Sequence, residues 1–156
     1  MITLNRILVP TDFSEFSRRA MDYACAMASR FESELHLLHI SPAAEMLIPE
    51  AAALGAENLV GHSEALEQAA KAQLDRLPPG GWENGKPIIR ATRIGAPFLE
   101  IVQYARDEEI DLIVLGTHGR SGLMHLLMGS VAENVVRKAP CPVMTVKPEG
   151  HQFVMP

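Results

Sequence analysis

The chain has 156 residues, of which 47% are hydrophobic and 21% charged, and its formal net charge is −5. This composition is that of a globular domain with a proper core, which excludes disordered and fibrous proteins. Lys and Arg form no run longer than an adjacent pair, and no apolar stretch is long enough to span a bilayer. We therefore expect a soluble protein that binds neither nucleic acid nor membrane.

The cysteines and the start of the chain indicate a cytoplasmic protein. Cys25 and Cys141 stand far apart, in no metal-ligand or CxxC spacing. The opening MITLNRILVPTD lacks the basic and then apolar pattern of a signal peptide. A reducing compartment is the expected location.

The first half of the chain alternates apolar runs with helical patterns. RILVP at 6–10 predicts a strand, and the polar turn TDFS leads into a helix that starts at Ser14. The predicted buried stripe of this helix is Phe16, Ala20, Tyr23, Ala24, Met27 and Phe31. A second strand at 34–40 precedes a loop or broken helix, and a further helix at 57–77 ends at the Pro-Pro-Gly-Gly that follows it.

The second half repeats the alternation. PIIRATRI at 87–94 predicts an edge strand, and Pro97 opens the next helix. DLIVLG at 111–116 is apolar without alternation, as expected of a central strand covered on both faces by helices. Ser130 and Glu133 form an S-x-x-E pattern that predicts a capping box at the start of the last helix.

A final strand at 142–148 closes the pattern, and 149–156 is expected to be a C-terminal tail. Strands that alternate with helices predict one α/β domain over 1–148, with an open parallel sheet, right-handed crossovers and helices on both faces.

The stretch GTHGRSGLMHLLMGS at 116–130 holds the strongest functional signal. In an open α/β sheet, ligands bind beyond the carboxyl ends of the strands, where the strand order reverses. If the strands at 6–10 and 111–116 are neighbours there, PTDFS and GTHGRSG converge on one site. Gly116 and Gly119 would let the backbone approach a ligand closely, and a helix that starts at Gly129 favours an anion. We therefore expect a phosphate there, with Arg120 as a charged contact.

Two common phosphate motifs do not account for the pattern. GGWENGKP at 80–87 matches most of a Walker A loop, but proline stands where a Ser or Thr must reach the metal. The Gly-x-Gly-x-x-Gly fingerprint of dinucleotide-binding folds is absent from the sequence. A standard P-loop or Rossmann enzyme is therefore disfavoured.

The glycine spacing resembles that of the universal stress protein family. The resemblance rests on G-x2-G-x9-G-S from Gly116 to Ser130, with PTD after the first strand and APCPV before the last. It implies a flavodoxin-like five-stranded parallel sheet in the order 3-2-1-4-5. It also implies the ATP-binding branch of the family, and a homodimer that pairs the last strands, 142–148.

The resemblance also implies the site residues, position by position. Pro10, Thr11 and Asp12 match the loop after the first strand, where the carboxylate lies near the ribose and any Mg or Mn bound with ATP. Ile40 matches the position that holds the adenine. The phosphate and ribose loop and the helix start that follows it are matched by Gly116, Thr117, His118, Gly119, Arg120, Gly129, Ser130 and Val131.

The sequence is also compatible with other roles for these residues and with other functions. Ser130 could be only an N-cap, Asp12 could cap the first helix or begin a turn, and His118 would have no role without the family match. The first function is a nucleotide-dependent regulatory dimer that contacts an unknown protein partner in the stress response. A slow ATPase or a protein that phosphorylates itself, with Ser130 as acceptor, is the second, although no catalytic base is evident. A flavin carrier is the third, with only Phe13 and Phe16 as aromatic candidates.

Overall fold

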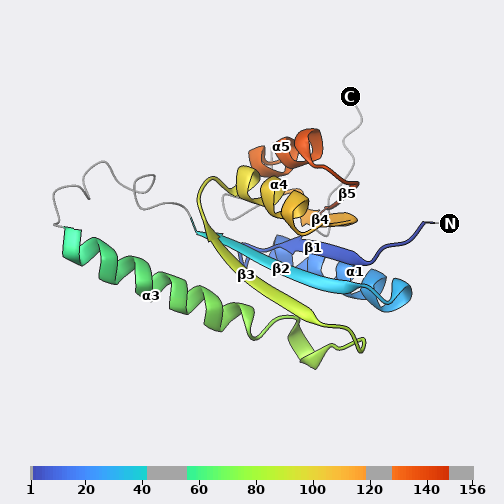
Figure 1. Ribbon diagram of the computed structural model, residues 1–156, viewed down its shortest axis with the longest axis horizontal. Coiled ribbons are helices and arrows are strands. Elements are labelled where there is room, and N and C mark those ends of the chain that lie inside the picture. The colour runs from blue at the N-terminus through green and yellow to red at the C-terminus, as the bar shows by residue number, and fades with distance from the viewer. Residues whose placement is uncertain (1, 42–55, 119–127, 148–156) are drawn as a thin grey trace.

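The computed structural model describes residues 2–41, 56–118 and 128–147, and for 56–63 it describes the backbone alone. Its centre is a parallel five-stranded sheet in the order β3-β2-β1-β4-β5 (Figure 1). The strands are β1 (Arg6–Pro10), β2 (Glu34–Ser41), β3 (Ile88–Ile94), β4 (Leu112–Gly116) and β5 (Val143–Val146). The flavodoxin-like fold and the strand order predicted from the sequence are confirmed.

Helices cover both faces of the sheet. On one face lie α1 (Glu15–Phe31) and α3 (Ala56–Leu74), and on the other lie α4 (Pro97–Asp107) and α5 (Ser130–Lys138) (Figure 1). Alternate residues of β4 enter the two cores: Leu112 and Val114 pack with α1, while Ile113 and Leu115 pack with α4 and α5. The prediction that this strand is buried on both faces is confirmed.

Helix α1 lies closer to the sheet than its large side chains suggested. Its N-cap is Ser14, whose side chain accepts a hydrogen bond from the backbone N–H of Ser17. The buried face consists mostly of small residues, which are Ser17, Ala20, Met21, Ala24, Cys25 and Ala28. Tyr23 and Phe31 are each 44% exposed, so the predicted stripe was wrong about them. Small side chains allow the helix to pack closely on the strands, so the face rich in alanine is buried and the larger side chains of Tyr23 and Phe31 stay partly exposed.

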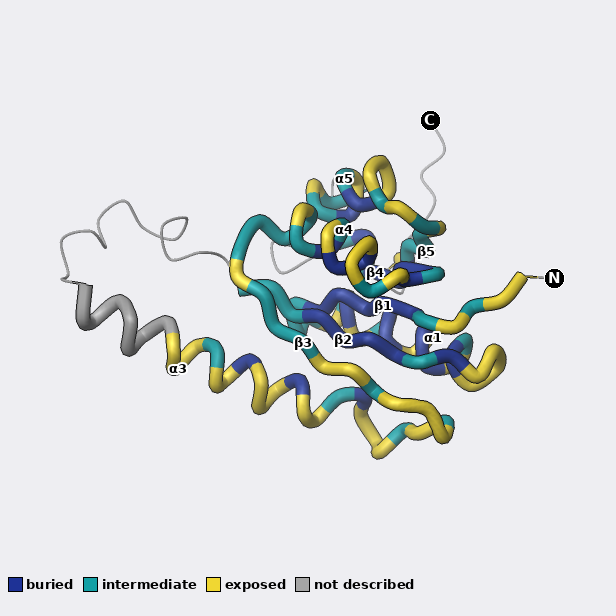
Figure 2. The backbone as a smooth tube through the Cα atoms, viewed as in Figure 1, coloured by how far each residue is buried: buried dark blue, intermediate teal, exposed yellow. Residues whose placement is uncertain are grey.

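Helix α3 covers the face of the sheet near β2 and β3, and within its described side chains only Ala70 and Leu74 are buried (Figure 2). A short 3-10 helix, η2 (Pro79–Gly81), follows it. Arg90 of β3 donates hydrogen bonds to the carbonyl oxygens of Leu74, at 3.0 Å, and Leu77, at 2.6 Å. These bonds satisfy carbonyl groups at the helix end that lack an intrahelical partner.

The predicted capping box of α5 is wrong. Gly129 is the N-cap, and no side chain among the described residues caps the helix. Ser130 is the first helical residue, and Glu133 pairs instead with Arg137, at 2.9 Å. The expected strand end and tail, at residues 148–156, lie outside the described part of the chain. Within the described residues, no helix has the length and apolar character needed to cross a membrane.

Candidate functional site

A cavity of about 380 Å³ lies beyond the carboxyl ends of β1 and β4. The chain runs outward from β1 to β3 on one side of the sheet and from β4 to β5 on the other, so the strand order reverses here. Ligands of open α/β sheets bind at such a switch point. The lining residues are Pro10, Thr11, Asp12, Ser17, Ile40, Pro97, Ile101, Leu115, Gly116, Thr117, His118, Gly129, Ser130, Val131 and Ala132.

The loop from β1 to α1 forms one wall and is tied down by its own polar groups. The N–H of Thr11 donates to the carbonyl of Leu38, at 2.8 Å, and its hydroxyl accepts from the N–H of Phe13, at 3.1 Å. Asp12 accepts from the N–H of Ser14, at 3.0 Å, but Ser14 itself is the cap of α1. The capping role considered for Asp12 is therefore wrong, whereas the turn considered for it is confirmed by this bond. Its carboxylate lies at the cavity, on a loop of fixed shape.

Gly116 ends β4 where the backbone passes very close to α1. A Cβ added at this position would lie 2.9 Å from the carbonyl oxygen of Phe16, so any other residue would force the backbone apart. A close approach, rather than a left-handed conformation, explains this glycine. Thr117 follows it and is buried, and its hydroxyl forms a 2.9 Å hydrogen bond with Nδ1 of His118.

The start of α5 closes the cavity on the other side. The N–H of Gly129 donates to the carbonyl of Thr117, at 2.7 Å, which joins the two ends of the glycine-rich segment. Gly129 has an extended conformation, with φ −71 and ψ 157, and brings no side chain to the first N–H groups of the helix. Unpaired N–H groups and the helix dipole make such a terminus favourable for an anion.

Of the twelve residues predicted from the sequence, ten line this one cavity; the other two, Gly119 and Arg120, lie outside the described residues. Their binding of a nucleotide stays a prediction. The sequence analysis missed Ser17, Pro97, Ile101, Leu115 and Ala132. Pro97 and Ile101 are four residues apart, at the start of a helix that follows a strand of the same sheet, which is a signal that the sequence carried.

The described residues show neither a cluster of metal ligands nor a reactive thiol. Among the described residues, no group of three or more His, Cys, Asp or Glu side chains has the geometry to hold a metal ion. Burial, and secondarily the charge of Asp22, raises the pKa of the Cys25 thiol to about 12, and burial also raises the pKa of Cys141. Both thiols are therefore protonated near neutral pH and are poor nucleophiles.

Sequence comparison gives one family over nearly the whole chain. A sequence model of the universal stress protein family matches residues 3–147. Two similar proteins come from Methanocaldococcus jannaschii. Universal stress protein MJ0531 is 35% identical over 91% of this chain and 81% of its own. Universal stress protein MJ0577 is 33% identical over 94% of this chain and 96% of its own.

Solved structures agree with the sequence relatives. The structure of MJ0577 has a TM-score of 0.82 and 31% identity, and covers 96% of this chain and 99% of its own. UspA from Lactobacillus plantarum has a TM-score of 0.74 and 26% identity, over 94% and 99% of the two chains. A universal stress protein solved in complex with cAMP has a TM-score of 0.63 and 25% identity, over 94% and 98%.

Proposed function

The chain belongs to the universal stress protein family, and we propose that its switch-point cavity binds an adenine nucleotide, with ATP as the expected ligand. The observation that carries the proposal is the convergence of ten predicted residues, from β1, β2, β4 and α5, on a single cavity of about 380 Å³. A structural relative in complex with cAMP supports the choice of an adenine nucleotide.

The chemistry of the lining suggests how the ligand would lie. Apolar side chains from β2 and α4, namely Ile40, Pro97 and Ile101, suit the flat base. The first turn of α5 at Ser130 suits the phosphates, because its N–H groups and its dipole favour negative charge.

Between these ends, the Asp12 carboxylate suits the ribose hydroxyls, to which it would accept hydrogen bonds. If Mg or Mn accompanies ATP, the phosphates and water would supply most of the metal's ligands, and Asp12 would add at most one carboxylate. The proposal therefore requires no metal site built by the protein alone.

We further propose that the protein acts in the cytoplasm as a nucleotide-dependent homodimer. β5 is one of the two outermost strands of the sheet, and no described strand pairs with its outer edge, which could therefore pair with a second copy. The start of α5 and the end of β4 both line the cavity, and β4 pairs with β5 along its length. Nucleotide occupancy would thereby influence the dimer edge, and sedimentation with and without ATP tests this. A monomer at micromolar concentration in both conditions would contradict it.

The direct test of the nucleotide site is calorimetric titration with ATP, ADP, AMP and cAMP, with and without Mg. The matched variants are Asp12→Asn, at the cavity, and Asp22→Asn, which removes the same charge from an exposed position on α1 that does not line the cavity. We expect affinity for ATP to fall roughly tenfold in the first variant and to stay unchanged in the second.

A thermal melt supplies a second readout. Ligand at about a hundred times its Kd adds roughly 2.7 kcal/mol to the free energy of unfolding, so the Tm should rise by several degrees. The proposal fails if no adenine nucleotide binds to protein that has been shown free of copurified nucleotide. It also fails if the two variants lose the same affinity, since that would indicate attraction to the overall charge rather than a site.

A further inference from the structure

A second cavity, of about 230 Å³, lies between the start of α1 and the end of α3. It is lined by two arginines, Arg18 of α1 and Arg76 in the turn after α3, and none of its lining residues is acidic. Its only residue in common with the switch-point cavity is Ser17. Two separate cavities therefore meet at one side chain.

The two arginines differ from most other arginines in the described part of the chain. Arg6, Arg93 and Arg137 form ion pairs with carboxylates, and Arg90 donates its hydrogen bonds to the end of α3. Neither the Arg18 nor the Arg76 guanidinium has an ion pair or a hydrogen bond with any residue that the structure describes. Two guanidinium groups on one cavity, with no carboxylate in its lining, form a setting that attracts an anion.

Neutral donors accompany this charge. The Ser14 hydroxyl accepts from the N–H of Ser17, at 3.3 Å, which leaves its own proton free for a ligand. The Gln73 side chain, one turn before Arg76, also lines the cavity and brings an amide that can donate. Phosphate oxygens need several donors, and these side chains supply them around the two positive charges.

The remaining wall is apolar and firmly held. Phe13, Met21 and Leu77 line it, so a ligand with an organic part would find a surface to pack against. Phe13 has a left-handed backbone conformation, with φ 62, and its ring stacks on His39 with 4.4 Å between centroids. A bulky residue with positive φ is rare and is retained where the surroundings fix it.

The opposite wall is equally anchored. Arg90 holds the carbonyl groups of Leu74 and Leu77, and the segment between them carries Arg76. The backbone N–H of Arg76 donates to the carbonyl of Gln73, at 3.2 Å, which keeps the turn closed. Both walls of the cavity are therefore preorganised, which reduces the cost of ordering them when a ligand binds.

We infer that this cavity is a second anion site, which takes the phosphate group of a small organic phosphate between Arg18 and Arg76. The inference does not depend on nucleotide binding, because the site has its own charges, donors and apolar wall. Thr11 and Ser17, whose hydroxyl oxygens lie 3.1 Å apart, stand between the two cavities, so each ligand would be felt at the other site through this pair.

The test is a titration of the full chain with phenyl phosphate, followed by two-dimensional NMR of the backbone amides. Inorganic phosphate and benzyl alcohol serve as separate probes of the charge and of the apolar part. We expect saturable shifts at Ser17, Arg18 and Arg76, weaker binding of inorganic phosphate, and no saturable binding of benzyl alcohol. Arg18→Gln and Arg76→Gln should each weaken phenyl phosphate binding roughly tenfold.

Arg30→Gln is the matched control, because Arg30 is an exposed arginine in the last turn of the same helix and does not line the cavity. Unchanged affinity in this variant supports the site. An equal loss in all three variants would indicate general attraction to positive charge and would overturn the inference. Shifts confined to Ser130 and Val131 would place the probe in the switch-point cavity and would overturn it as well, as would the absence of saturable binding.

Discussion

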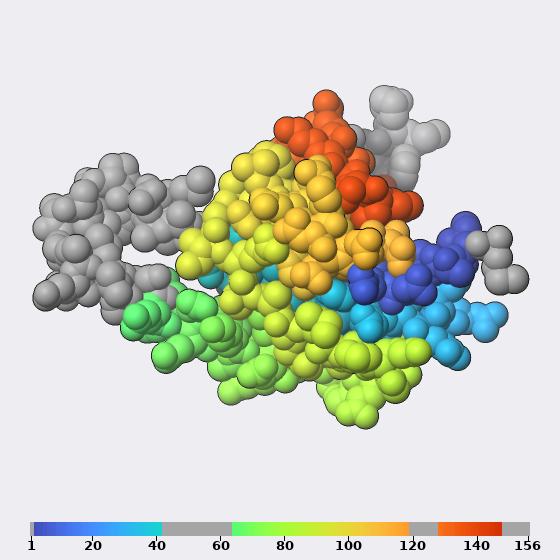
Figure 3. Space-filling model, in the orientation of Figure 1, coloured from blue at the N-terminus to red at the C-terminus, as the bar shows by residue number. Residues whose placement is uncertain are grey.

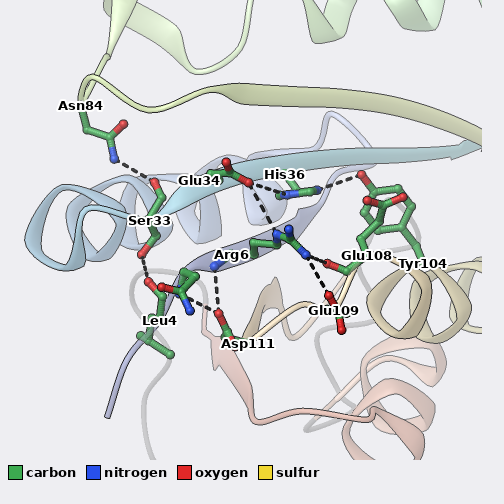
Figure 4. A network of polar contacts seen from close by, with 11 residues as sticks. Leu4, Arg6, Ser33, Glu34, His36, Asn84, Tyr104, Glu108, Glu109 and Asp111 are labelled. Carbon is green, nitrogen blue, oxygen red and sulfur yellow. Dashed lines mark hydrogen bonds and ion pairs between the residues drawn. The ribbon is translucent and has the colours of Figure 1, made fainter. Parts of the chain in front are cut away.

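The two ends of the sheet are built in opposite ways. At the carboxyl end, the loops after β1 and β4 and the start of α5 enclose a cavity, and the first turn of α5 has no side-chain cap. At the amino end, polar groups of β1, of β2 and of the segment before β4 form hydrogen bonds and ion pairs with one another (Figure 4). These polar groups of the amino end are therefore paired within the protein, whereas the first turn of α5 at the carboxyl end has no cap from a described side chain.

The network at the amino end joins segments that are far apart in the sequence. Asp111 accepts hydrogen bonds from the N–H groups of Asn5, at 2.6 Å, and Arg6, at 3.0 Å. The Arg6 guanidinium donates to the carbonyl of Glu108, at 2.9 Å, and pairs with the carboxylates of Glu34 and Glu109 (Figure 4). The side chains are partly or largely exposed, at 38% for Arg6 and 84% for Glu109, so each contact adds only modest stability. The contacts of the amino end therefore add up to a contribution to stability, whereas at the carboxyl end no described side chain caps the first turn of α5.

The largest expected effect is on ATP affinity, and it comes from Gly129→Asp, which adds a carboxylate cap to the start of α5. The backbone of Gly129 already has the extended conformation of an N-cap, so the new carboxylate would accept from the first N–H groups of α5 and oppose a phosphate. We expect affinity for ATP, measured by calorimetry, to fall roughly 100-fold or more. The free energy of unfolding should change by less than about 1 kcal/mol.

Gly129→Asn is the control for this substitution, because it offers the same cap without the charge. An added Cβ would lie 3.3 Å from the carbonyl oxygen of Thr117, and both variants share that tight contact. A loss that is larger for Asp than for Asn would mark a phosphate at the helix start. Equal affinity in both variants and in the unmodified protein would rule out the first turn of α5 as the phosphate site.

In the space-filling view, the dark blue residues near the start of the chain lie against orange residues of the segment around α4 and β4 (Figure 3). Asp111→Ala should act at the amino end alone. It removes the acceptor of two backbone N–H groups and should lower the free energy of unfolding by about 1–2 kcal/mol, measured by denaturant unfolding. ATP affinity should not change, since the network lies at the opposite edge of the sheet.

Asp111→Asn keeps an amide oxygen that can still accept, so it should cost less than Asp111→Ala. If the two substitutions cost the same, the charge of Asp111 matters more than its hydrogen bonds. A fall in nucleotide affinity with either one would show that the two ends are not independent.

The sequence revealed most of the carboxyl end, because its signals are local. Gly116, Thr117 and Gly129 stand in one stretch, and PTD follows a strand whose apolar pattern is plain. Hydrophobic periodicity and the turn residues then place both loops at one edge of a parallel sheet. The sequence predicted that the backbone at Gly116 approaches something closely, but not that this is Phe16, since that contact depends on how closely α1 packs.

The polar contacts at the amino end could not be predicted from the sequence, because they are long-range. Asn5 and Asp111 are 106 residues apart, and His36 and Tyr104 are 68 apart, so no local pattern relates them. The capping box failed for a similar reason: Gly129, whose N–H donates to the distant carbonyl of Thr117, takes the cap position, and Ser130 is the first helical residue. Local rules predict the type of an element well, while its end depends on tertiary contacts.

The smallest expected effect is a pH dependence that arises at His36 of the amino end. Its Nδ1 forms a 3.0 Å hydrogen bond with the Tyr104 hydroxyl, and its Nε2 is buried, 3.8 Å from the Glu34 carboxylate (Figure 4). Burial lowers the pKa of His36 below 6.5, and Arg6 lowers it further, while the charges of Glu108 and Glu34 oppose the shift. The folded protein therefore favours the neutral ring.

The sign of the effect follows from this lowered pKa. The unfolded chain takes up the proton first as the pH falls through 6.5, so this contribution to stability is fully present above 6.5 and is lost toward the folded-state pKa. A His36→Gln variant should therefore lose less stability than the unmodified protein between neutral and mildly acidic pH. NMR titration of the His36 ring measures the pKa directly, and a value at or above 6.5 would contradict the assignment. Since Tyr104 lies one turn beyond Ile101 on α4, the same titration with ATP present would show whether the amino end senses the cavity.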